Sequence, residues 1–280
     1  MRIVNEAGRA CLVVDGGLVD VESATGGTLP ADPQALYDRW DDLRAWAAGY
    51  AEGPTRPYRA ELLGPPAPRP RQVFAIGLNY RDHAAESGMD VPDAPLVFTK
   101  FPASITGPEA VVDLPRGSVD FETELVVVLG RECYRVSAAG AWDHVAGLTV
   151  GQDLSERELQ LRPPTPQFNL GKSYPGFAPM GPELVTPDEF PDRDDIGLGC
   201  RLNGEQMQKS STGDMIFPVA DIIAHLSSIL PLYSGDVVFT GTPAGIGMAR
   251  RPARFLTAGD ELVTFAEGIG SMRTRFTAPS

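Results

Sequence analysis

Three acidic residues stand at the front of an otherwise apolar segment, and this arrangement limits what the chain can fold into. Asp120, Glu122 and Glu124 occupy alternate positions leading into the apolar run 125–129. Side chains alternate between the faces of a strand, so Glu122 and Glu124 point the same way, with Asp120 in line behind them. Burying these carboxylates is unfavourable unless a cation neutralises them. The pattern predicts a divalent metal site, and oxygen ligands suit Mg²⁺, Mn²⁺ or Ca²⁺ rather than zinc.

A third ligand is expected where a second apolar stretch ends. Residues 147–152 lead directly to Asp153, and residues 154–160 then have helical character. Three carboxylates would leave about three positions of an octahedral Mg²⁺ open to water or to a chelating substrate. Two other interpretations stay open. Glu122 and Glu124 could lie on a solvated strand face, and Asp153 could close a turn or cap a helix.

Histidine is scarce, which narrows the search for a catalytic base. His83 has Glu86 three residues later, so the two side chains would be neighbours on a helix. A carboxylate there could orient the imidazole and raise its basicity, which makes His83 a candidate general base. Pairs with this spacing are also common by chance. The other two histidines, His144 and His225, are expected at helix boundaries or on the surface.

Two segments resemble nucleotide-binding loops only in part. Lys172 does not belong to a Walker A loop, because Pro166 stands where that loop needs glycine. The segment 240–247 is not a dinucleotide fingerprint, since its glycines are wrongly spaced and Pro243 interrupts the turn. We expect a tight loop there, either a plain turn or one that brings backbone amides and the Thr242 hydroxyl to an anionic ligand.

The composition indicates an acidic globular protein. A formal net charge of −13 argues against nucleic acid and anionic membrane as partners, because both favour basic surfaces. The 3 cysteines are scattered without CxxC spacing, which indicates neither a disulfide framework nor a zinc site. No basic and then apolar leader opens the sequence, and no apolar run approaches the roughly 18 residues of a membrane span. We therefore expect a soluble, cytoplasmic protein.

Two domains are predicted. A small N-terminal α/β domain, 1–65, contains a hairpin within 2–14 and an amphipathic helix over 32–50. The proline-rich segment 63–70 forms a stiff linker to a main domain, 66–280. Helical spacing there is clear only over 218–230. Short strands are predicted at 72–77, 96–99, 124–129, 196–202, 236–240 and 261–265. Strands and helices do not alternate regularly, so an α+β fold dominated by a mixed β-roll or barrel is favoured over a doubly wound sheet.

Five motifs, taken in order, resemble the fumarylacetoacetate hydrolase family. They lie at residues 77–83, 120–125, 152–160, 171–173 and 239–245. The resemblance covers roughly residues 70–270, and five ordered motifs are far more specific than any one of them. It implies a β-rich roll, a homodimer, small oxo-acid substrates and a mobile lid at about 81–93.

The resemblance also implies roles for individual residues. Glu122, Glu124 and Asp153 would bind Mg²⁺ or Mn²⁺, His83 and Glu86 would activate water, Lys172 would stabilise developing negative charge, and Arg157, Gln160, Gly241 and Thr242 would contact substrate. Such a site would suit a hydrolase that cleaves a carbon–carbon bond in an acylpyruvate or related 2,4-dioxo acid. Oxaloacetate decarboxylation and isomerisation of a 2-hydroxydienoate pass through the same enolate and remain alternatives. A noncatalytic binding protein is a further alternative, although it would not need both a base and a group that stabilises an oxyanion, the roles implied for His83 with Glu86 and for Lys172.

Overall fold

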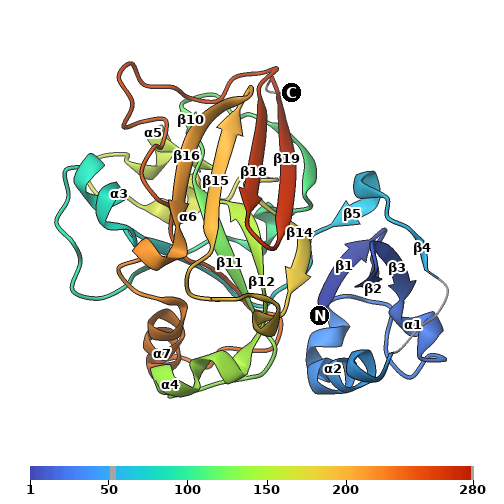
Figure 1. The fold of residues 1–280 in the computed structure, drawn as a ribbon. Helices are drawn as coiled ribbons and strands as arrows, with labels where there is room; N and C mark the ends of the chain where they lie inside the picture. Colours follow the sequence, from blue (N-terminus) through green and yellow to red (C-terminus); the bar gives the residue numbers. More distant parts are fainter. Residues whose placement is uncertain (51–54, 279–280) are drawn as a thin grey trace.

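The computed structural model describes residues 1–50 and 55–278. A large mixed sheet crosses the molecule (Figure 1). Its 12 strands follow the order β4-β3-β2-β1-β14-β12-β11-β17-β6-β7, with β5 beside β1 and β8 beside β14. Their bounds are β1 Arg2–Glu6, β2 Arg9–Val14, β3 Gly17–Asp20, β4 Arg56–Pro57, β5 Leu63–Gly64, β6 Val73–Gly77, β7 Leu96–Thr99, β8 Ile105–Thr106, β11 Thr123–Leu129, β12 Val145–Gln152, β14 Ala178–Val185 and β17 Val237–Phe239.

A second, 5-stranded sheet packs across β11 and β12 (Figure 1). It consists, in order, of β16 Glu205–Ser211, β15 Gly197–Leu202, β18 Glu261–Ala266, β19 Gly270–Thr277 and β9 Glu109–Asp113. A short ribbon joins β10 Val119–Asp120 to β13 Ser155–Glu156. The strand-rich, mixed architecture confirms the predicted fold class.

The helices are short and lie outside the sheets. They are α1 Val21–Ala24, α2 Trp40–Gly49, α3 Arg81–Glu86, α4 Ala138–Ala141, α5 Arg157–Gln160, α6 Phe168–Gly171 and α7 Val219–Ile229, with 3-10 turns at Ala35–Arg39, Ala60–Leu62, Pro102–Ser104, Trp142–His144, Pro187–Glu189 and Thr212–Asp214. No helix in the described ranges is long and apolar enough to cross a membrane.

All the main-domain strands and the helix predicted from the sequence are present within one residue or so. Two helical predictions were wrong in extent. The helix expected over 32–50 is split, because Arg39 leaves the helical backbone region at φ −123° and ψ 27°. The helical character expected over 154–160 begins only at Arg157, because Ser155 and the following residue pair with β10 instead.

The apolar run of β11 is explained by burial on both sides of the sheet. Leu125 and Val127 pack in one cluster with Ile223 of α7, whereas Val126 packs in a second cluster with Trp40 of the N-terminal unit. A strand covered on both faces reads as a continuous hydrophobic segment. The N-terminal strands also extend the large sheet, since β1 pairs with β14. The boundary at residue 65 stays a prediction.

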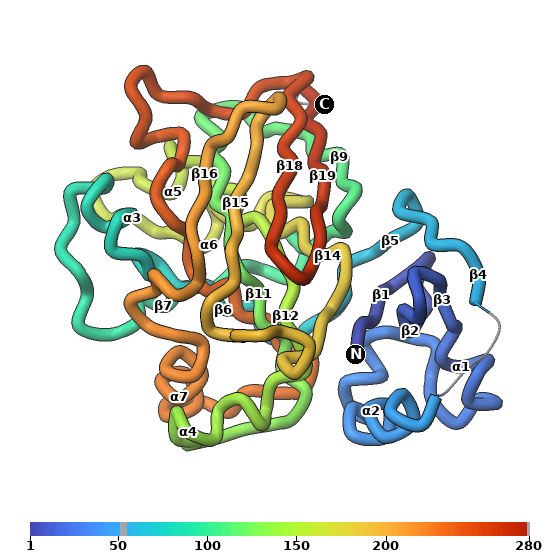
Figure 2. Tube along the Cα trace, viewed as in Figure 1, coloured from blue at the N-terminus to red at the C-terminus, as the bar shows by residue number. Residues whose placement is uncertain are grey.

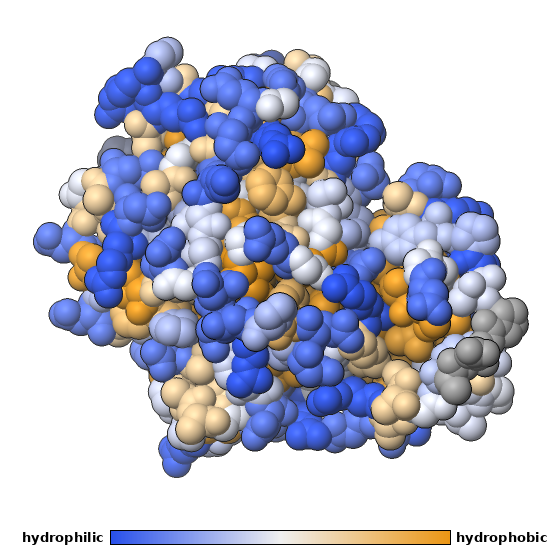
Figure 3. All heavy atoms as spheres, viewed as in Figure 1, coloured by the Kyte–Doolittle hydropathy of each residue, from blue (hydrophilic) through white to orange (hydrophobic). Residues whose placement is uncertain are grey.

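Polar residues cover most of the face shown in Figure 3, and apolar residues show between them in the main body and in the N-terminal unit. The segment that follows α3 runs along the side of the molecule opposite the N-terminal unit in the tube view (Figure 2). This segment belongs to the predicted lid, 81–93. Within it the apolar side chain of Met89 is 56% exposed.

Candidate active site

The structure brings Glu122, Glu124 and Asp153 together. The antiparallel register of β11 and β12 pairs Glu124 with Gly151, and the amide of Asp153 donates a 2.9 Å hydrogen bond to the carbonyl of Glu122. One carboxylate oxygen from each of the three lies within 4.8 Å of the others, and all three residues are buried. We refer to these three carboxylates as the triad. This spacing suits one shared cation with oxygen ligands.

Glu124 provides the test of whether the triad fits a metal ion. Its carboxylate accepts a 2.8 Å hydrogen bond from the amide of Gly241, but it forms no ion pair with any residue in the described ranges. Burial raises its pKa well above the usual value, and the neighbouring charges of Asp153 and Glu122 raise it further. A divalent cation would remove both penalties and hold the carboxylate ionised. The donor set therefore fits a hard divalent ion.

Lys172 lies against the triad. Its ammonium nitrogen is 2.6 Å from Glu122 and 2.5 Å from Asp153. Burial opposes the charge of Lys172, but the carboxylates of Asp153 and Glu122 outweigh it and raise its pKa. The lysine is therefore held protonated beside the triad.

A second buried lysine, Lys100, was not found from the sequence. It follows β7, and its ammonium donates to Asp153 at 2.6 Å and to the carbonyl of Lys172. Burial lowers the pKa of Lys100, and Asp153 compensates only in part. A single lysine after a short strand usually reads as a surface residue, so the sequence held no signal for this role.

Arg157 connects the triad to Asp120. Its guanidinium makes two hydrogen bonds to Oδ2 of Asp120, at 3.0 and 2.8 Å, and lies 2.7 Å from Oε1 of Glu122. It also donates to Gln160 at 2.9 Å. Burial would raise the pKa of Glu122, but Lys172 and this guanidinium outweigh it and lower that pKa. Asp120 thus fixes the arginine and stays outside the triad.

The His83–Glu86 pair forms as its spacing predicted, on α3. Nδ1 of His83 lies 2.8 Å from Oε1 of Glu86, and the other carboxylate oxygen of Glu86 accepts a 2.9 Å hydrogen bond from the amide of Gly245. With Nδ1 facing a carboxylate, Nε2 is the nitrogen left to accept a proton. Glu86 is held at both oxygens, so it can fix the orientation of the imidazole.

The loop after β17 supplies backbone amides to the site carboxylates. Gly241 donates to Glu124, while Gly247 and Met248 donate to Asp120 at 2.7 and 3.0 Å. The sequence left open whether these amides would approach an anion. In the structure the anions are side chains of the protein itself, and the loop acts as a fixed source of positive partial charge around them.

One cavity of about 400 Å³ contains this chemistry. Of the residues assigned from the sequence, those that line it are His83, Glu86, Glu122, Glu124, Arg157, Gln160, Lys172 and Thr242. Asp153 and Gly241 lie behind this lining, and the Thr242 hydroxyl accepts a 2.7 Å hydrogen bond from Gln208. A cavity of this size, with clustered polar groups and an apolar wall, is typical of a small-molecule site.

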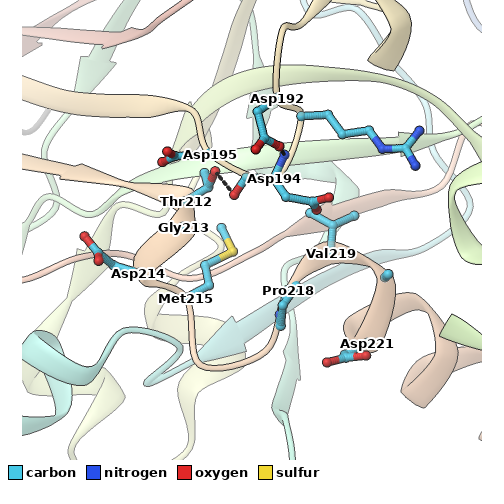
Figure 4. Close-up of a pocket in the computed structure, with 12 residues that line it drawn as sticks. Asp192, Asp194, Asp195, Thr212, Gly213, Asp214, Met215, Pro218, Val219 and Asp221 are labelled. Carbon is cyan, nitrogen blue, oxygen red and sulfur yellow. Dashed lines mark hydrogen bonds between the residues drawn. The ribbon is translucent and has the colours of Figure 1, made fainter. Parts of the chain in front are cut away.

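A larger hollow of about 640 Å³ lies elsewhere and is bordered by several aspartates, including Asp192, Asp194 and Asp221 (Figure 4). Its cation, Arg193, lies over the ring of Trp142 with 4.4 Å to the centroid. No triad residue lines it, and it has none of the convergent buried ion pairs that distinguish the first cavity. The smaller cavity is therefore the candidate active site.

Comparison with known proteins agrees with this geometry. The family model described as Fumarylacetoacetate (FAA) hydrolase C-terminal matches residues 72–277. Human oxaloacetate tautomerase FAHD2A, mitochondrial, is 42% identical over 259 residues, which cover 91% of this chain and 82% of the human protein. Among solved structures, a Mycobacterium smegmatis protein assigned as HpcE is 53% identical, with a TM-score of 0.96 and coverage of 100% of both chains. Maleylpyruvate hydrolase from Sphingobium sp. SYK-6, in complex with manganese(II) ion and pyruvate, is 25% identical, with a TM-score of 0.82 and coverage of 100% of both chains.

The strand-rich roll and its buried carboxylate triad define a class of enzymes that act on small molecules. The chain belongs to the fumarylacetoacetate hydrolase family. The relatives described above are named as a hydrolase and a tautomerase. Membership of the family therefore indicates an enzyme but does not determine which reaction it catalyses.

Proposed function

We propose that this enzyme hydrolyses a carbon–carbon bond in an acylpyruvate or a related 2,4-dioxo acid, with Mg²⁺ or Mn²⁺ held by Glu122, Glu124 and Asp153. The observation that carries the proposal is that two of the triad carboxylates, Glu122 and Glu124, line the same cavity as the His83–Glu86 pair. The first suits a chelating oxo acid, and the second suits activation of water. The manganese(II) ion and pyruvate bound to the Sphingobium maleylpyruvate hydrolase support this assignment.

A bound divalent ion would polarise the oxo-acid oxygens and stabilise the negative charge that develops when the bond breaks. Nε2 of His83 would take a proton from water as its oxygen adds to the acyl carbon. The bond between that carbon and its neighbouring methylene carbon would then break, leaving a carboxylic acid and the enolate of pyruvate, which takes up a proton at carbon. Lys172 lies beside the triad, where its charge would stabilise the departing enolate.

Tautomerisation or decarboxylation of oxaloacetate is the second candidate. It is favoured by the human relative, which is named an oxaloacetate tautomerase. Both reactions pass through an enolate and need no water in the bond-breaking step, so the same triad and Lys172 could serve them.

Product analysis by NMR separates the two candidates. Purified protein with Mg²⁺ is supplied with acetylpyruvate and, separately, with oxaloacetate. We expect acetate and pyruvate from acetylpyruvate. Turnover of oxaloacetate alone, with acetylpyruvate left intact, would contradict the hydrolase proposal and favour the second candidate. The same assay after EDTA treatment tests for metal dependence. We expect EDTA to abolish turnover and added Mg²⁺ to restore it.

We further propose that the protein is a cytoplasmic homodimer that takes a small oxo acid and has neither nucleic acid nor membrane as a partner. The strongly acidic composition supports the last two points, since both of those partners favour basic surfaces. Size-exclusion chromatography with multi-angle light scattering measures the molar mass in solution and so tests the dimer. A mass equal to that of one chain would contradict it.

A further inference from the structure

A glutamine buried behind the triad joins two of its members. Gln152 is the last residue of β12 and directly precedes Asp153, and it has no exposed surface. Its side-chain oxygen Oε1 accepts a 2.8 Å hydrogen bond from the amide of Glu122. The residue next to one metal ligand therefore holds the backbone of another.

The side-chain amide of Gln152 uses both of its N–H donors. Nε2 lies 2.9 Å from Oγ1 of Thr123 and 2.9 Å from Oγ1 of Thr264, and both threonines are buried. Thr123 begins β11, whereas Thr264 lies on β18 of the second sheet. A buried polar network in which each donor of the amide has a partner is rigid. Gln152 thus fixes the start of β11 against the second sheet.

Glu122 depends on this side chain because it lies just before β11. Within the described residues its amide has no backbone partner, and Oε1 of Gln152 takes that place. Its carbonyl accepts the hydrogen bond from the amide of Asp153. Both backbone polar groups of Glu122 are bound by two consecutive residues, so the backbones that carry the two carboxylates are held at a fixed separation.

Lys172 also bridges Glu122 and Asp153, but in a different way. Its ammonium contacts the carboxylate oxygens, which are the atoms that a cation would use. Gln152 acts through the backbone, so its hydrogen bonds do not compete with the ion. The glutamine can therefore keep the same geometry in the metal-free and the metal-bound protein.

The rigidity of a carboxylate site affects which divalent ion it favours. Mg²⁺ requires near-ideal octahedral geometry at about 2.0–2.1 Å, whereas Ca²⁺ accepts irregular geometry at about 2.3–2.6 Å. A triad whose members can shift should lose affinity for Mg²⁺ more than affinity for Ca²⁺. Partners that orient metal ligands typically change metal affinity by about 10–100-fold.

We propose that Gln152 is a positioning residue that holds Glu122 and Asp153 at a fixed separation and so gives the triad its preference for Mg²⁺ over Ca²⁺. This inference rests on the proposed function only in that the triad binds a divalent ion. It is independent of which bond the enzyme breaks.

Competition between metal ions tests the proposal without any substrate. Displacement of bound Mn²⁺, followed by electron paramagnetic resonance of the released ion, measures the affinities for Mg²⁺ and for Ca²⁺. In Gln152→Met, which keeps the length of the side chain but loses its hydrogen bonds, we expect the ratio of Mg²⁺ affinity to Ca²⁺ affinity to fall by about tenfold. Thr264→Val removes one anchor of the glutamine and should shift the ratio in the same direction by a smaller factor. It carries the test if Gln152→Met does not fold.

Gln72→Met is the matched control. The side-chain amide of Gln72 donates to the carbonyl of Pro231 at 3.1 Å and to Asp236 at 2.8 Å. Asp236 precedes β17, whereas Gly241, which contacts the triad, follows that strand. This variant therefore loses a glutamine network away from the triad, and its ratio should equal that of the unmodified protein.

An unchanged ratio in Gln152→Met, an equal loss of affinity for both ions, or the same shift in Gln72→Met would each overturn the proposal. So would an unchanged ratio in Thr264→Val if that variant carries the test. Failure of the proposed function looks different. If acylpyruvates are not hydrolysed but the ion preference depends on Gln152, the reaction assignment fails and the role of Gln152 stands. Binding of neither ion by the unmodified protein would overturn both the metal site and this role.

Discussion

The ammonium nitrogen of Lys100 lies 2.6 Å from Oδ1 of Asp153, and neither side chain has any exposed surface. Removing one partner of a buried ion pair costs about 3–5 kcal/mol when the remaining charge is left uncompensated. Here Lys172 would still pair with Asp153, so a loss at the lower end of that range is expected. Lys100→Met should therefore lower the free energy of unfolding of the metal-free protein by about 3 kcal/mol. Mg²⁺ should stabilise the variant more than it stabilises the unmodified protein, because the cation replaces part of the lost positive charge.

Denaturant unfolding with and without Mg²⁺ measures both effects. Lys209→Met is the control, since Lys209 is an exposed lysine on β16 that forms no ion pair in the described part of the chain. A metal-free Lys100→Met protein as stable as the control would show that the buried pair does not support the site.

Gly245 connects the loop after β17 to Glu86, and a side chain there should damage the water-activating pair. Its φ is +107°, and a Cβ would collide with the carbonyl oxygen of Met207. Gly245→Ala should displace the amide that holds Glu86, so kcat should fall by about tenfold or more while Mn²⁺ affinity stays within about twofold. Gly259→Ala separates backbone strain from collision, because Gly259 has a φ of +93° and open space around its Cβ position. Equal losses of kcat in the two variants would argue against a specific link to Glu86.

His83 and Glu124 should respond differently to truncation. Glu124→Ala removes a triad ligand and should abolish both Mn²⁺ binding and activity. His83→Ala removes the base and should reduce hydrolysis by about 10²–10⁴-fold while metal affinity is kept. Calorimetric titration with Mn²⁺ next to a hydrolysis assay separates the two outcomes. Equal loss of metal in both variants would overturn the division of roles.

The sequence was most informative where charged side chains stand in a segment that is expected to be buried. Glu122 and Glu124 could be assigned because carboxylates at the start of an apolar strand need an explanation, and His83 because a carboxylate stands at helical spacing from it. Asp153 was found from its place at the end of β12, although a turn or capping role was the favoured interpretation for that residue taken alone.

The undetected parts of the site lack such a signal. Lys100 looks like a surface lysine in the sequence, and only the tertiary fold buries it against Asp153. For the loop 240–247 the sequence left open an approach of backbone amides to an anion, but no residue type reveals that Gly241 and Gly247 donate to carboxylates of the protein itself. Asp120 shares the alternation of the triad, but its pairing with the guanidinium of α5 depends on contacts between distant segments.

The central claim is that Glu122, Glu124 and Asp153 hold one divalent ion, and anomalous diffraction from crystals soaked in Mn²⁺ tests it most directly. The account predicts one anomalous peak per chain, within coordination distance of all three carboxylates, that is absent in Glu124→Ala. No peak between these residues in the unmodified protein, or a peak that persists unchanged in the variant, would contradict it.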